Sequence, residues 1–127
     1  LEGDYVVYRL TELYFNKAEA LMRLNGGNAT QEAVDLINES KMRYFTEEDW
    51  AEEAYTTTSL TMSELLAERG REFIFEGMRR TDLIRFGEFT TGSWWDHDPS
   101  GDPNLTLYPI PFRQLQANPN LVQNPGY

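Results

Sequence analysis

The chain has 127 residues, a formal net charge of −10 and a hydrophobic fraction of 40%, which together predict one globular domain with a buried core. The excess of acids argues against nucleic acid as a partner, because phosphate binding needs clustered lysine and arginine. The lack of cysteine excludes disulfides, thiol catalysis and cysteine-bound zinc, and no apolar run approaches the ~20 residues of a membrane helix. We expect no cofactor and no metal site.

Residues 8–45 are predicted to form an antiparallel helical hairpin that follows a short extended lead-in at residues 5–8. The first helix should end at Asn25-Gly26-Gly27, and Thr30 can cap a second helix that runs to about Phe45. An apolar stripe on the first helix comprises Leu10, Leu13, Tyr14, Leu21 and Leu24, and small residues for the helix contact are Ala18, Ala20 and Ala33. The hairpin has tetratricopeptide character, and such repeats normally stack in about three copies, so we expect missing neighbours outside a chain that begins without Met.

The acidic segment at residues 47–53 surrounds Trp50. We expect a solvated turn or short helix whose tryptophan folds back onto the hairpin. A calcium site is the less favoured interpretation, because the alternating ligands and turn glycine of an EF-hand are missing.

Residues 61–87 are predicted to form the central helix. Thr61 and Glu64 make a capping box at its start. Gly70 and Gly77, seven residues apart, fall near one face, where the lack of a side chain allows close packing. A separate short helix from Arg79 to Phe86, ended by Gly87, is a plausible continuation after Gly77.

Carboxylates form a row on this helix, with Glu68, Glu72 and Glu76 four residues apart and arginines between them. Such a row could be a glycosidase pair or a set of metal ligands. However, an arginine within reach of each glutamate holds the carboxylate ionised and unsuited to act as a general acid. We therefore favour a structural ion-pair lattice and predict no catalytic residue.

Residues 90–106 are rich in Gly, Pro, Asp and Ser and predict an irregular surface loop. Trp94 and Trp95 could form a platform on which a sugar ring stacks, with Asp96, His97 and Asp98 nearby to bind its hydroxyl groups. The alternative, which we favour, is that one or both tryptophans plug the loop into the core.

Residues 107–127 form a proline-rich tail. Its prolines forbid a long helix, so only residues 112–116 can make a helical turn. The many large apolar side chains predict an extended tail that fills grooves along the helices.

Three stretches together resemble the C-terminal portion of the SusD/RagB family of Bacteroidetes outer-membrane nutrient-binding lipoproteins. They are residues 8–23, residues 65–86 and residues 108–127, the last with its Ile-Pro and Asn-Pro-Gly-Tyr sequences. The residues that carry the resemblance are Glu68, Arg69, Glu72, Phe73, Glu76, Gly77, Arg79, Asp82, Leu83, Arg85, Pro111, Asn124, Pro125, Gly126 and Tyr127.

This resemblance implies a mainly α fold and a non-enzymatic protein, lipid-anchored at the cell surface, that captures oligosaccharides or other nutrients. It also implies delivery to a SusC-like TonB-dependent transporter, with the shared residues acting as scaffold rather than as ligand contacts. Neither the anchoring cysteine nor most of the family scaffold is in this chain.

Two other classes remain open. One is a helical-repeat module that binds another protein. The other is a glycoside hydrolase fragment that uses Glu72 with Glu76 or Asp96 with Asp98 as its pair of carboxyl groups.

Overall fold

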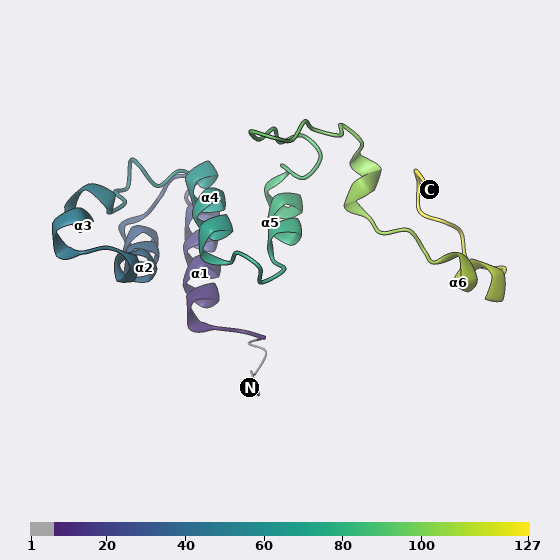
Figure 1. Ribbon diagram of the computed structural model, residues 1–127, viewed down its shortest axis with the longest axis horizontal. Coiled ribbons are helices and arrows are strands. Elements are labelled where there is room, and N and C mark those ends of the chain that lie inside the picture. Colours follow the sequence, from purple (N-terminus) through teal and green to yellow (C-terminus); the bar gives the residue numbers. More distant parts are fainter. Residues whose placement is uncertain (1–6) are drawn as a thin grey trace. The chain divides into compact units, whose positions relative to one another are not determined.

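A computed structural model describes residues 7–127, which contain six α-helices, two short 3₁₀ segments and no β-strand (Figure 1). The predicted mainly α class is confirmed, whereas the tetratricopeptide character remains a prediction. The lead-in predicted for residues 5–8 lies largely outside the described residues. The chain divides into two compact units, Leu1–Glu72 and Phe73–Tyr127, and each is described by itself. None of the helices within residues 7–127 is long and apolar enough to cross a membrane.

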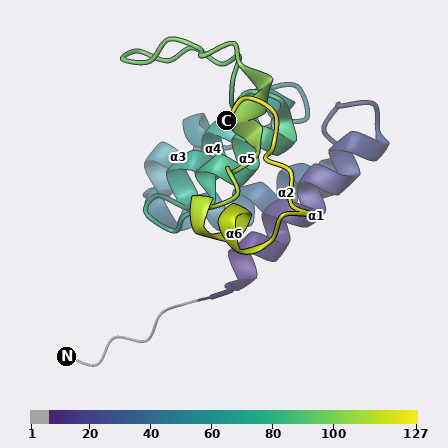
Figure 2. The same ribbon diagram turned by 90° about the vertical axis from the view of Figure 1, so that its right-hand side faces the viewer.

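The first unit begins with a helical hairpin. Helices α1 (Leu10–Leu24) and α2 (Gln31–Lys41) lie side by side in both views (Figures 1 and 2). The α1 helix ends where Asn25 donates its backbone N–H to the carbonyls of Leu21 and Met22, and the next two glycines have positive φ. The Thr30 hydroxyl accepts a hydrogen bond from the backbone N–H of Ala33 at 3.2 Å. Both predicted helix boundaries in this connection are therefore confirmed.

The two helices meet through a face of α1 other than the predicted leucine stripe. The buried apolar side chains of the hairpin are Phe15, Ala18 and Met22 on α1 with Ala33, Val34 and Ile37 on α2. Leu10, Leu13 and Leu24 are 61%, 60% and 88% exposed, so the stripe prediction was wrong. Ala18 and Ala33, both fully buried, are small side chains in this face, where they allow the helix backbones to approach closely.

A short arm follows the hairpin. The 3₁₀ segment η1 (Met42–Tyr44) leads to α3 (Glu47–Glu53), which Thr46 caps through the backbone N–H of Asp49. The ring centroids of Trp50 and Phe45 are 6.2 Å apart. The acidic segment is thus a short helix whose tryptophan folds back onto the end of the hairpin, as predicted.

The predicted central helix is interrupted. Helix α4 (Met62–Glu72) starts as expected, because the Thr61 hydroxyl accepts from the backbone N–H of Glu64 at 3.1 Å. It ends at Glu72, and Phe75 and Gly77 then take positive φ values of 64° and 77°. A residue in this left-handed region cannot continue a right-handed helix, so the continuous helix over residues 61–87 was wrong. A Cβ on Gly77 would meet nothing within 4 Å, so this glycine serves the backbone turn rather than close packing.

The second unit contains the separate short helix. Helix α5 (Arg79–Phe86) ends at Gly87, whose φ is 81°, as predicted. A narrow loop follows and leads to the 3₁₀ segment η2 (Pro103–Thr106). The Arg80 guanidinium donates to the carbonyls of Leu105 and Thr106 at 3.1 and 3.0 Å and lies 4.0 Å from the ring centroid of Tyr108. Arg80 therefore ties the start of the tail to α5.

The tail closes on itself. After Pro111, helix α6 (Phe112–Ala117) forms close to the predicted helical turn. The Gln123 side-chain amide accepts from the backbone N–H of Ile110 at 2.7 Å and donates to its carbonyl at 2.9 Å. Asn124 and Tyr127 donate to the carbonyls of Tyr108 and Leu107.

Several apolar side chains of the tail lie at the surface of the second unit: Tyr108, Phe112 and Val122 are 70%, 71% and 83% exposed. The predicted packing of the tail along the helices remains a prediction. Within the second unit, side-chain hydrogen bonds to the chain's own backbone hold the segment in place.

Candidate functional site

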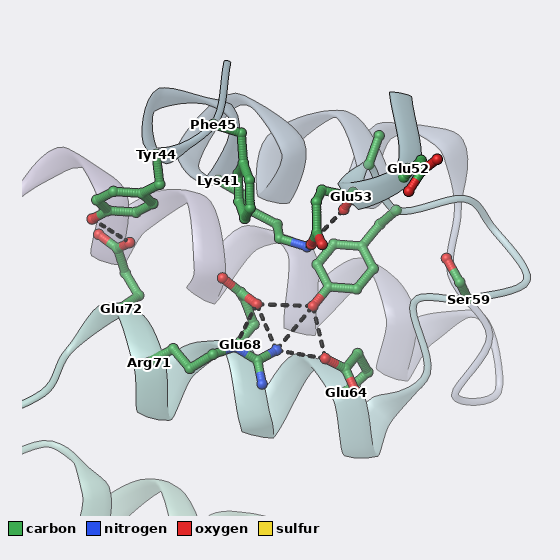
Figure 3. A pocket seen from close by; sticks show the side chains of 12 residues that line it. Lys41, Tyr44, Phe45, Glu52, Glu53, Ser59, Glu64, Glu68, Arg71 and Glu72 are labelled. Carbon is green, nitrogen blue, oxygen red and sulfur yellow. Dashed lines mark hydrogen bonds and ion pairs between the residues drawn. The ribbon is translucent and has the colours of Figure 1, made fainter. Parts of the chain in front are cut away.

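A groove of about 680 Å³ lies between the arm and α4 in the first unit (Figure 3). Its walls come from the end of α2, from η1 and α3, from the segment that follows α3, and from the polar face of α4. The volume is within the range of small-molecule sites, roughly 300–1,000 Å³.

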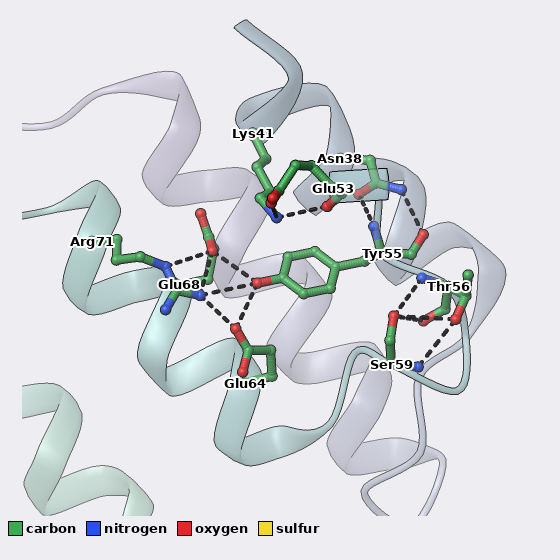
Figure 4. A network of polar contacts seen from close by, with 9 residues as sticks. All are labelled: Asn38, Lys41, Glu53, Tyr55, Thr56, Ser59, Glu64, Glu68 and Arg71. Atoms are coloured by element: carbon green, nitrogen blue, oxygen red, sulfur yellow. Dashed lines mark hydrogen bonds and ion pairs between the residues drawn. The ribbon is translucent and has the colours of Figure 1, made fainter. Parts of the chain in front are cut away.

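The wall on α4 is a polar network centred on Tyr55 (Figure 4). The Tyr55 hydroxyl oxygen is 2.8 Å from carboxylate oxygens of both Glu64 and Glu68. The Arg71 guanidinium donates to the hydroxyl oxygen at 3.0 Å and to both carboxylates at 2.5–2.9 Å. A tyrosine hydroxyl carries one hydrogen, so the two carboxylates share that single donor and depend on Arg71 for the rest of their hydrogen bonds.

This network changes the acidity of its members. The hydrogen bond from Tyr55, with a further one from Arg71, holds the pKa of Glu64 below its usual value despite burial. Burial and the hydrogen bonds to the two glutamates raise the pKa of Tyr55. Burial alone would lower the pKa of Arg71, but the hydrogen bonds to Glu68 and Glu64 raise it overall. The carboxylate of Glu64 is therefore held ionised, and the Tyr55 hydroxyl is held neutral.

Lys41 occupies the opposite wall. Its ammonium group lies 4.4 Å from the ring centroid of Tyr55 and 5.2 Å from that of Phe45. It donates to the backbone carbonyl of Glu53 at 2.6 Å and to the carboxylate at 3.1 Å. The two rings and Glu53 thus hold this cation on the groove wall, because the faces of aromatic rings attract positive charge.

Glu72 lies at one end of the groove and is the most buried member of the glutamate row. Its side chain is 1% exposed. The carboxylate accepts hydrogen bonds from Arg9, from Arg43 and, at 3.0 Å, from the Tyr44 hydroxyl. Arg9 also donates to the backbone carbonyl of Glu72 at 2.7 Å. The lattice therefore joins α4 to residues before α1 and after α2.

The sequence indicates an arginine within reach of each glutamate, and Glu68 does pair with Arg71 three residues later. It does not indicate Tyr55 as a partner of Glu64 and Glu68, or Arg9 and Arg43 as partners of Glu72. No local pattern indicates these partners, because they lie 63 and 29 residues away from Glu72 along the chain.

Arg69, on another face of α4, serves the hairpin. It is 2% exposed, donates to the side-chain oxygen of Asn16 at 3.1 Å and lies 5.8 Å from the ring centroid of Phe15. This residue therefore fixes α4 against α1 from the inside.

Most of the other residues that carry the family resemblance belong to the second unit. Asp82 is 2% exposed and accepts from Arg85 at 2.7 Å within α5. Glu76 and Gly77 lie in the turn before α5, and Arg79 is its first residue. Toward the chain end, Pro111 precedes α6, and the last four residues, Asn124, Pro125, Gly126 and Tyr127, belong to the closing tail.

The two loop tryptophans differ in their surroundings. Trp94 pairs with His97 in an isolated antiparallel bridge and borders a small hollow of about 340 Å³ with Leu83 and Phe89. A Cβ on Gly92 would lie 2.4 Å from the Trp94 ring, so that ring packs directly over the glycine backbone. Trp95 is 99% exposed, and Asp96 is exposed beside it. One tryptophan thus packs within the second unit and its neighbour projects into solvent.

A model of the SusD family matches residues 1–104, which is most of the chain. The chain belongs to the SusD family. The resemblance inferred from the sequence is thereby confirmed: the stretches at residues 8–23 and 65–86 lie inside the region matched by the family model, and the relatives below align with nearly the whole chain.

Two relatives within this SusD family align with nearly the whole chain. Starch-binding protein SusD of Bacteroides thetaiotaomicron is 38% identical over 133 aligned residues, which cover 99% of this chain and 22% of that protein. SusD-like protein P25 of Formosa agariphila is 30% identical over 133 residues, which cover 96% of this chain and 24% of that protein. The chain therefore spans less than a quarter of the length of these relatives.

Proposed function

We propose that this chain is scaffold in a non-enzymatic nutrient-binding protein of the cell surface, and that the nutrient is a glycan. The bound glycan passes to a SusC-like TonB-dependent transporter in the outer membrane, and a lipid anchor outside this chain holds the protein there. Family membership and the name of the starch-binding relative support this proposal.

The ion-paired carboxylates of α4 are the observation on which the scaffold role depends. Glu64 and Glu68 share the Arg71 guanidinium, and Glu72 is enclosed by two arginines. A general acid must carry a proton near neutral pH, whereas the hydrogen bonds from Tyr55 and Arg71 hold the pKa of Glu64 below its usual value. In this proposal the three glutamates join elements to one another rather than transfer protons.

Ligand contact in this proposal falls to the loop of the second unit. The exposed Trp95 offers an apolar ring face to sugar C–H groups, and Asp96 offers an acceptor for hydroxyl groups. Trp94 supports the loop by packing over Gly92 and completes the predicted site.

A chimera tests the scaffold role directly. This chain would replace the matching 22% of Bacteroides thetaiotaomicron SusD, and starch binding would be measured by affinity electrophoresis beside the unmodified protein. We expect the chimera to fold and to bind starch within about tenfold of the parent, which is roughly 1.4 kcal/mol. A folded chimera that binds no starch would contradict the scaffold role.

The hydrolase alternative has its own assay. The chain would be incubated with a chromogenic glycoside and the released product measured. Turnover that is abolished in Glu72→Gln or Glu76→Gln would support a hydrolase instead of a binding protein. We expect no turnover above the uncatalysed rate.

A protein-binding module is the second candidate, and the exposed leucines of α1 favour it. Leu10, Leu13 and Leu24 project from one helix and are each at least 60% exposed. Apolar side chains gathered on one helix face are typical of surfaces that contact protein. Replacing the three leucines by serine should raise solubility without loss of glycan binding if the nutrient-binding role is right, because the ligand site lies elsewhere.

A further inference from the structure

We infer that the groove between the arm and α4 is a second saccharide site, one that takes a neutral, hydroxyl-rich ring of an oligosaccharide. This inference rests on the proposed glycan-binding function and adds a site in the first unit, apart from the tryptophan loop. It is drawn from the shape of the groove, its aromatic wall and the balance of its charges.

The aromatic wall supplies a stacking surface that is already fixed. Tyr44 is 62% exposed, yet its hydroxyl donates to Glu72 at 3.0 Å and the Arg43 guanidinium lies 4.8 Å from its ring centroid. A ring that is held at its hydroxyl end loses little conformational freedom when a ligand arrives. The apolar C–H face of a sugar can therefore stack on Tyr44 at a low entropic cost.

The charges of the groove favour a neutral ligand. Glu64 and Glu68 pair with Arg71, Glu53 pairs with Lys41, and Glu72 has its own arginines. An anion would meet five acidic side chains, and a cation would compete with guanidinium and ammonium groups already in place. Within residues 7–127, no group of three or more acids or histidines is arranged to hold a metal ion. Paired carboxylates still accept hydrogen bonds from neutral hydroxyl groups.

Glu52 provides an acceptor at the far end of the groove. Figure 3 shows Tyr44 and Glu52 on opposite sides of the pocket, with Lys41 between them. Glu52 is exposed, and in the described part of the chain it makes no ion pair. A sugar ring stacked on Tyr44 with the next ring toward Glu52 would place hydroxyl groups against a carboxylate that has no other donor.

The test is an NMR titration of the isotope-labelled chain with maltohexaose, and with oligogalacturonate and chitosan oligomers as anionic and cationic counterparts. We expect saturable shifts of backbone amides in residues 41–55 with the neutral sugar and weaker effects with both charged ones. Tyr44→Ala should lower the affinity for maltohexaose at least about fivefold, because a stacking contact is lost. Tyr44→Phe keeps the ring and should remain within about threefold of the wild type.

Matched controls separate ring loss from general damage. Tyr8→Ala removes another exposed tyrosine of the first unit, and Glu48→Ala removes an exposed acid of α3 outside the groove. Neither should change affinity. Glu52→Ala, at an exposed side chain that cannot disturb the fold, should weaken binding about threefold or more through the lost hydrogen bond to a charged group.

Results that would refute the groove site differ from results that would refute the proposed function. Binding that survives in Tyr44→Ala and Glu52→Ala but is lost in Trp95→Ala would overturn this inference and leave glycan binding at the loop intact. Stronger binding of either charged oligomer, or no shift with maltohexaose, would also overturn it. The chimera experiment decides the proposed function independently of both outcomes.

Discussion

Replacing Tyr55 by phenylalanine removes one hydroxyl group and leaves the ring in place. In the folded protein this oxygen lies 2.8 Å from Glu64, 2.8 Å from Glu68 and 3.0 Å from Arg71. The substitution therefore isolates the contribution of the central donor in the polar network.

The expected cost is about 2 kcal/mol of unfolding free energy. A hydrogen bond to a charged group contributes about 1.5–3 kcal/mol net. The side chains of Glu64 and Arg71 are 39% and 55% exposed, so solvent reduces the contribution of their hydrogen bonds to the unfolding free energy. Glu68 is 6% exposed, so its carboxylate would lose a donor where water does not replace it fully.

The stability difference should also depend on pH. The folded pKa of Glu64 lies below its ordinary value of 4.5, with the Tyr55 hydrogen bond as the first cause. A lowered pKa adds stability that is present above the unfolded value and is lost as pH falls through the folded value. Tyr55→Phe removes part of this shift, so the difference between wild type and variant should shrink as the pH falls below about 4.5.

Urea denaturation followed by far-ultraviolet circular dichroism measures both quantities. The matched control is Tyr14→Phe, which removes an exposed hydroxyl that donates to Glu39 at 3.2 Å and should cost much less than Tyr55→Phe, because water replaces the lost partner. A Tyr55→Phe variant as stable as this control, or a difference that grows on acidification, would refute the role given to the hydroxyl.

Three further substitutions test other features. Glu72→Gln removes the charge of a carboxylate that is 1% exposed and should cost about 3 kcal/mol in the same denaturation assay; Glu32→Gln, in an ion pair whose partners are both 57% exposed, should cost less than about 0.5 kcal/mol. Gly126→Ala places a Cβ 2.7 Å from a neighbouring side chain at φ 90°, so hydrogen exchange of residues 107–127 should accelerate, and unchanged exchange would show that the tail is held differently. Gly92→Ala puts a Cβ 2.4 Å from the Trp94 ring and should shift the indole N–H resonance of that residue, whereas an unaltered resonance would contradict the packing described.

Features set by neighbours in the chain could be predicted from the sequence. Thr30 and Thr61 cap helices through backbone groups three residues away, and Gly87 ends α5 in the left-handed conformation. In each case the residue type and a short spacing determine the geometry. The second half of the Thr61 capping box is different: the Glu64 carboxylate binds Tyr55 and Arg71.

Features set by distant contacts could not be predicted in the same way. The apolar periodicity of α1 is real, but it does not reveal that Phe15 and Met22 are buried while Leu13 remains exposed. Burial of a helix face is decided by the element packed against it. The same limit applies to Glu72, whose arginines approach from two remote segments.

The candidate sites likewise combine features that local sequence predicts with features that depend on distant contacts. The exposure of Trp95 agrees with a loop rich in turn residues. The packing of Trp94 over Gly92 has no signal in the sequence, because many glycines in such loops only serve turns. The groove in the first unit was not predicted at all, because Tyr44, Glu52 and Tyr55 come from segments that carry no shared pattern.

The Gln123 amide imitates a peptide group, with its oxygen and nitrogen bonded to the N–H and carbonyl of Ile110. Those two backbone groups are consequently not available to an incoming extended peptide, so this part of the tail resists the edge-to-edge association that unpaired main chain invites. A glutamate at the same position would retain the acceptor and lose the donor. Whether the Ile110 carbonyl is satisfied thus depends on the identity of a single side-chain atom.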